Sequence, residues 1–171
     1  MFDQYSMSES VKKYETKFEK VPEKYFDDET VISEAYVDVK LPRRATQYSA
    51  GYDFYIPYSC KIYPGESRII DTYVRCRIHP NYFLALVPKS GLGFKYHVSL
   101  ANTMGIIDSD YYNNDDNGGH IMVKLVNNGK EPLTLIKGDK FCQGIFIPYG
   151  LTTDDNPLQC ERTGGFGSTG R

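Results

Sequence analysis

The sequence predicts an all-β domain. Strand-length segments rich in β-branched and aromatic residues recur along most of the chain, and Pro, Gly and Asn separate them. Many short strands at such spacing indicate a sandwich or a barrel. With 171 residues, 40% hydrophobic and 25% charged, the chain is long enough for one domain with a core. The expected strands span residues 36–41, 60–63, 67–78, 82–87, 120–126, 133–136 and 141–147.

The first 35 residues form an N-terminal extension that we expect to be partly helical. Ser6 and Glu9 have the spacing of a capping box, and apolar residues recur at helical intervals from Val11 until Pro22 interrupts them. This pattern predicts one amphipathic helix over residues 8–21. The segment has no cluster of nucleophiles, bases or metal ligands, so we expect it to pack against the domain or a neighbouring subunit.

Composition excludes several classes of function. The formal net charge of −2 argues against direct nucleic-acid binding, which relies on an excess of Lys and Arg. We expect no membrane span and no secretion signal, because apolar runs are short and the N-terminus is acidic and polar. The four cysteines never form C-x-x-C, so they are expected to be reduced thiols in a cytoplasm, that of a bacterium or of a phage-infected host.

The chain ends in a glycine-rich arm, residues 161–171, without an aliphatic side chain. Glycine loses the most backbone entropy on ordering, so such an arm is expected to order only against a ligand. Closely spaced backbone N–H groups, hydroxyls and the Arg162 guanidinium suit phosphate oxygens, and Phe166 offers a flat face for a base. The alternative is an ordinary disordered tail.

Two internal segments carry chemistry. Lys89, Ser90 and Gly91 follow the apolar run 83–87, which would place a cation, a hydroxyl and a permissive residue at one sheet edge. This segment predicts an anion-holding turn, although a plain solvated turn has the same composition. It matches neither the P-loop nor the dinucleotide fingerprint.

Asp108 follows an apolar Gly-Ile-Ile approach that could leave its carboxylate at the mouth of a cleft, where it could take a proton from water. The alternative is a structural carboxylate that caps a turn by accepting hydrogen bonds from neighbouring backbone N–H groups. Residues 113–118 resemble the start of a calcium loop, but the twelfth position is Lys124 where a Glu is required. We therefore predict a surface turn over residues 113–119.

Taken in order, these segments resemble the motifs of the trimeric dUTP diphosphatase (dUTPase) family over residues 37–170. The stretches R-T-G-G-F-G-S-T-G and G-I-I-D-S-D-Y are the most specific. The resemblance implies a jelly-roll-like β domain over residues 36–160, closed by the arm, in a homotrimer whose active sites are shared between chains. It also implies hydrolysis of dUTP to dUMP and pyrophosphate, which limits uracil in DNA and supplies dUMP for thymidylate synthesis.

The resemblance also implies residue roles. Asp108 would activate the water that attacks the α-phosphorus, Tyr111 would pack on deoxyribose, and Asn102 would lie beside uracil. Asp53 would hold Mg²⁺ through water. The remaining implied substrate-binding positions are Lys89, Ser90, Gly91, Gly105, Ile107, Gln143, Arg162, Phe166, Gly167, Ser168 and Thr169.

The sequence departs from the family pattern in places. Lys89 replaces the usual arginine, and an insertion, residues 113–118, follows Tyr112. Arg162 stands one residue nearer the first glycine of the arm than is common. One alternative is a dCTP deaminase relative, but its motifs are not visible, and zinc deaminase motifs are also missing. Another is a nucleotide-gated regulatory protein that binds a partner through the arm or the insertion.

Overall fold

The structure, a computed structural model, describes residues 15–26 and 35–157. All strand pairs in these residues are antiparallel, and one short α-helix accompanies them, which confirms the all-β prediction. The strands are β1 (Lys17–Lys20), β2 (Arg43–Arg44), β3 (Tyr52–Tyr55), β4 (Cys60–Ile62), β5 (Ser67–Asp71), β6 (Val74–Arg77), β7 (Tyr82–Pro88), β8 (Val98–Leu100), β9 (Gly105–Ile107), β10 (Met122–Asn127), β11 (Leu133–Leu135) and β12 (Lys140–Pro148). The helical elements are η1 (Glu23–Tyr25), α3 (Ser90–Tyr96) and η2 (Ser109–Tyr111).

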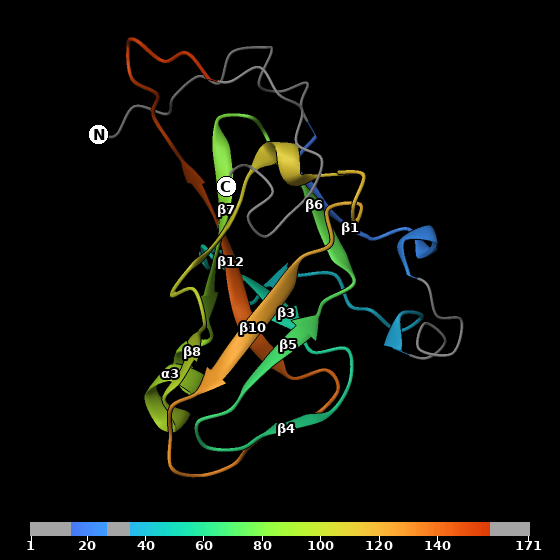
Figure 1. Cartoon of the computed structure of the whole chain (residues 1–171), viewed down its shortest axis with the longest axis vertical. Coiled ribbons are helices and arrows are strands. Elements are labelled where there is room, and N and C mark those ends of the chain that lie inside the picture. Colours follow the sequence, from blue (N-terminus) through green and yellow to red (C-terminus); the bar gives the residue numbers. More distant parts are fainter. Residues whose placement is uncertain (1–14, 27–34, 158–171) are drawn as a thin grey trace.

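Two main sheets enclose the core. One has the strand order β2-β3-β12-β7-β9 and the other β5-β10-β8, and Figure 1 shows β10 and β5 crossing in front of β12. Leu84 and Leu86 of β7 belong to the same buried cluster as Ile70 of β5 and Val123 and Leu125 of β10. Apolar side chains of both sheets therefore exclude water between them, as in a β-sandwich.

The predicted helix over residues 8–21 is wrong for its described part. Residues 8–14 lie outside the described residues, and Lys17–Lys20 form strand β1, which pairs with β6. The Phe18 ring packs against Tyr52, Phe54 and Phe146, with centroids 5.3 to 5.7 Å apart. These tertiary contacts and the β6 backbone outweigh the helical spacing, which is a weak local signal. This part of the extension thus belongs to the β structure.

Two of the expected strands also need correction. The single strand expected over 67–78 is two strands, because Thr72 Oγ1 donates to the Ile121 carbonyl at 2.6 Å and Tyr73 adopts a left-handed φ of 56°. β5 then pairs with β10, whereas β6 pairs with β1. Residues 36–41 contain a turn and no strand, since the Tyr36 and Val37 carbonyls accept from Lys20 Nζ.

Five of the expected strands are confirmed in the described part of the chain. Strands were found within or overlapping the segments expected at 60–63, 82–87, 120–126, 133–136 and 141–147. Cys60, Cys76 and Cys142 are buried free thiols. Among the described helices none is long and apolar enough to cross a membrane.

Candidate active site

A single buried carboxylate, that of Asp53, lies among polar side chains from three neighbouring strands. In the register of the sheet, Asp53 of β3 lies opposite Gln143 of β12, and Lys89 comes directly after the end of β7. Lys89 Nζ and Gln143 Nε2 both donate to Asp53 Oδ1 at 3.0 Å. Lys140 Nζ lies 2.7 Å from Oδ2 as an ion pair, although the contact is not that of an aligned hydrogen bond. The sheet therefore places two ammonium groups on one carboxylate.

The electrostatics of Asp53 follow from these partners. Its side chain is 1% exposed, and burial alone would raise the pKa of its carboxyl group. Lys140, Gln143 and Lys89 outweigh that effect and lower the pKa to about 2. In return, Asp53 raises the pKa of Lys140. Asp53 is therefore ionised at neutral pH and fixes both lysines.

This arrangement does not fit a carboxylate that holds a hydrated metal ion. Asp53 has no solvent-exposed face, and both oxygens are already against cations. A third cation beside two ammonium groups would be repelled. In the described residues, moreover, no three His, Cys, Asp or Glu side chains cluster as a metal site. The predicted metal role of Asp53 thus finds no support in its surroundings.

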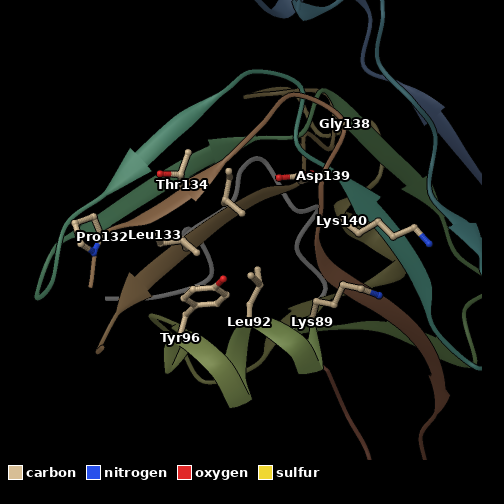
Figure 2. Close-up of a pocket in the computed structure, with 10 residues that line it drawn as sticks. Lys89, Leu92, Tyr96, Pro132, Leu133, Thr134, Gly138, Asp139 and Lys140 are labelled. Atoms are coloured by element: carbon tan, nitrogen blue, oxygen red, sulfur yellow. The ribbon is translucent and has the colours of Figure 1, made fainter. Parts of the chain in front are cut away.

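The lysines border a hollow of about 640 Å³ between α3 and the β11–β12 region (Figure 2). Leu92 and Tyr96 of α3 line it from one side, and Leu133 lines it too. Ser90 and Gly91 are exposed at the start of α3, in the segment that we expected to be a turn. A Cβ added at Gly91 would meet no atom within 4 Å, so packing does not require glycine there.

A second hollow, of about 450 Å³, brings four of the predicted site residues together. Asn102, Gly105, Ile107 and Tyr111 all line it. Gly105 pairs with Leu86 of β7, and a Cβ at this glycine would lie 3.1 Å from Leu86 Cβ. Glycine therefore allows β9 to approach β7 closely and shapes the floor of the hollow.

Asp108 lies in sequence between Ile107 and Tyr111, which line this second hollow, and is not itself a lining residue. It directly follows Ile107, and its backbone carbonyl accepts from the Tyr111 amide at the start of η2. Its side chain is exposed and makes no capping hydrogen bond to η2, so the turn-capping alternative does not explain it. A carboxylate in this position can reach water beside a bound molecule.

The Asp53 group lies on the face of the sheet opposite to Leu86, which lines the second hollow. Cross-strand partners share a face and neighbours along a strand alternate, so Asp53, Gln143 and Val87 lie opposite to Leu86. Leu86 lines the 450 Å³ hollow, and no residue lines both hollows. In one copy of the described chain, the hollow beside Lys89 and Lys140 and the hollow that Leu86 lines are therefore separate.

Some site residues were not predicted from the sequence. Lys140 had no assigned role. The sequence feature that could have indicated one is its position three residues before Gln143, just ahead of the strand expected over 141–147. Asn117 donates to the Tyr111 hydroxyl from the insertion, and no pattern indicated that contact. Of the predicted residues, Arg162, Phe166, Gly167, Ser168 and Thr169 lie outside the described part of the chain.

Comparison with known proteins identifies the family. The sequence profile of the dUTPase family matches residues 37–170. A deoxyuridine 5'-triphosphate nucleotidohydrolase of Lactococcus lactis is 36% identical over 143 residues, which cover 83% of this chain and 95% of that protein. The dUTPase of Streptococcus mutans is 31% identical with a TM-score of 0.64, over 79% of this chain and 97% of that structure.

A more distant structure shares the fold. A mutant dUTPase from phage phi11 of S. aureus, described with a structural Mg(II) ion, is 18% identical with a TM-score of 0.63. The alignment covers 86% of this chain and 99% of that structure. The profile match and the two closer relatives span the β domain that carries both groups of site residues, and on that basis this chain belongs to the dUTPase family.

Proposed function

We propose that this chain hydrolyses dUTP to dUMP and pyrophosphate. The observation that carries the proposal is the 450 Å³ hollow that unites Asn102, Gly105, Ile107 and Tyr111, with Asp108 next to it. A deoxynucleoside fits a concave, partly apolar site of this size. Hydrolysis of dUTP would limit uracil in DNA and supply dUMP for thymidylate synthesis.

In the proposed mechanism, Asp108 takes a proton from a water that attacks the α-phosphorus, and pyrophosphate leaves. Phosphoryl transfer depends mainly on positioning and on neutralising oxygen charge. Lys89, which Asp53 holds in place, and Gln143 would contact the phosphate chain together with Ser90. Arg162 and the arm would close over the substrate and exclude other water.

Base and sugar selectivity would come from the second hollow. The turn that begins near Asn102 presents backbone groups between β8 and β9. Fixed donors and acceptors that match uracil would stay unpaired against cytosine, which costs binding energy. The Tyr111 ring would pack on deoxyribose and leave no room for a ribose hydroxyl.

We propose that three copies assemble so that the Asp53 group of one chain meets the Asp108 group of another. The separation of the two hollows, which share no lining residue in one copy of the described chain, supports this assembly. Dependence on Mg²⁺ remains a prediction, to be tested by chelation, and we derive no step through the ion because Asp53 does not suit it. No described residue favours a regulatory partner, and that hypothesis also remains a prediction.

A pyrophosphate-release screen across dUTP, dCTP, dTTP and UTP tests the proposal. We expect turnover of dUTP alone, and Asp108→Asn should slow it by about a hundredfold, the usual scale for a lost general base. The neighbouring Asp110→Asn is the control and should retain most activity. Turnover of dCTP in place of dUTP, or an unchanged rate in Asp108→Asn, would contradict the mechanism.

A further inference from the structure

The insertion after Tyr112 contacts the hydroxyl end of the Tyr111 ring. The Tyr111 hydroxyl donates to the His120 carbonyl at 2.9 Å, and Asn117 Nδ2 donates to that hydroxyl at 2.9 Å. Tyr111 is 6% exposed, and it lines the 450 Å³ hollow. Two hydrogen bonds therefore anchor the phenol at the end remote from the backbone, which restricts movement of the ring.

Asn117 is itself fixed by the loop. Its Oδ1 accepts from the amides of Gly119 and His120 at 3.0 and 3.2 Å, and from Asn114 Nδ2 at 3.0 Å. Asn114 Nδ2 also donates to the Tyr111 carbonyl at 2.9 Å. These bonds define which end of the Asn117 amide faces the loop and leave its nitrogen directed at the tyrosine hydroxyl.

The N-terminal segment holds this loop against the domain. The Tyr25 ring lies over Gly118, where an added Cβ would be 2.5 Å from Tyr25 Cε2. Tyr112 donates to Glu19 of β1, and the Arg75 and Arg77 guanidinium groups lie 4.7 and 5.0 Å from its ring centroid. Contacts from β1, η1 and β6 thus restrain the loop on both sides of Asn117.

From these contacts we infer that Asn117 is a positioning residue that sets discrimination between deoxyribose and ribose. It acts through the Tyr111 ring, which it keeps close to the sugar. The inference rests on the proposed function, because it takes the 450 Å³ hollow as the deoxynucleoside site. If the ring moved away, a ribose hydroxyl would gain room, and UTP would become a better substrate relative to dUTP.

The test compares kcat/KM for dUTP and UTP in wild type and Asn117→Ala. We expect the dUTP-to-UTP ratio to fall about tenfold, the scale of one hydrogen bond. Tyr111→Phe keeps the ring but removes the hydroxyl, so it should lower the ratio similarly. The double variant should resemble Tyr111→Phe, because that variant already lacks the hydrogen bond from Asn117. Asp115→Ala, an exposed change in the same loop, is the control and should keep the wild-type ratio.

The outcomes separate this inference from the proposed function. A wild-type chain that does not hydrolyse dUTP refutes the proposed function. An active wild type whose ratio is unchanged in Asn117→Ala refutes the positioning role alone, whatever the ratio in Tyr111→Phe. A merely structural role would lower the melting temperature and the activity on both substrates together, leaving their ratio unchanged, and this outcome also overturns the inference. Should Asn117→Ala fail to fold, the ratio in Tyr111→Phe decides.

Discussion

Asp53→Asn should destabilise the fold at neutral pH, because the ionised carboxylate holds two lysines. The pKa of Asp53 is about 2 rather than the ordinary 3.8, so ionisation stabilises the folded state by about 2 kcal/mol. Asparagine keeps the shape of the side chain but removes the charge between Lys89 and Lys140. Those two side chains are 30% and 37% exposed, so water takes up part of the loss. We expect a destabilisation of about 2 kcal/mol at pH 7.

The pH dependence has a definite sign. A lowered carboxyl pKa stabilises the fold fully above pH 3.8, and this contribution is lost as the pH falls through 2. The difference between wild type and Asp53→Asn should therefore be constant from pH 7 to 5 and shrink to about 1 kcal/mol at pH 3. Urea unfolding at fixed protein concentration measures both points, since association changes apparent stability.

Lys140→Met is the matched control for Asp53→Asn. It removes one ammonium group but leaves the hydrogen bonds from Lys89 and Gln143 to Asp53. Its loss of stability at pH 7 should be smaller than that of Asp53→Asn. Because the pKa of Asp53 would be lowered less, its acid-dependent loss should still begin near pH 3.8 but be complete at a higher pH than in wild type. If Asp53→Asn had the urea midpoint of wild type at every pH, the two ion pairs would only offset the cost of burying the carboxylate, and the reasoning would be refuted.

Two further predictions concern pH and assembly. Burial lowers the pKa of His120 to about 4 from 6.5, and its Nε2 accepts from the Tyr73 amide at 3.0 Å, so stability should fall by about 3 kcal/mol as the pH drops from 6.5 to below 4. His120→Gln keeps a hydrogen-bond acceptor but cannot take up a proton, so in urea unfolding its stability should depend less on pH between 6.5 and 4. The same dependence of stability on pH as in wild type would contradict this role of His120. An equal mixture of Asp108→Asn and Lys89→Met chains, unfolded and refolded together, should recover about one quarter of wild-type activity if each site takes one residue from each of two chains. Activity equal to the mean of the two parents would instead mean that sites are not shared.

Sequence reasoning succeeded where local pattern and tertiary structure agree. The apolar run 82–87 gave a central strand, and the apolar Gly-Ile-Ile segment before Asp108 lines a hollow, although no strand was expected over it. In both places the apolar residues lie on a strand, so the apolar composition of the segment agrees with its place in the fold. The family resemblance implied Asn102, Gly105, Ile107 and Tyr111 as site residues, and all four line one hollow.

Sequence reasoning failed where long-range contacts decide. Phe18 has the spacing of a helix but lies in β1, because its ring finds partners from β3 and β12. Lys140 approaches Asp53 across 87 positions of sequence, since β12 pairs with β3. The bulge between Lys140 and Cys142 changes which side chains share a face, and alternation alone cannot foresee it.

The separation of the two polar groups gives a physical reason for association. β9 is an edge strand of the five-stranded sheet, and Ile106 in it is 55% exposed beside the 450 Å³ hollow. An open apolar edge next to an incomplete site is a surface that a second copy could cover. Lys89 and Lys140 line the other hollow, and no residue lines both hollows. A neighbour that covered the edge of β9 while presenting its own Lys89 would bury apolar surface and complete the site in one step.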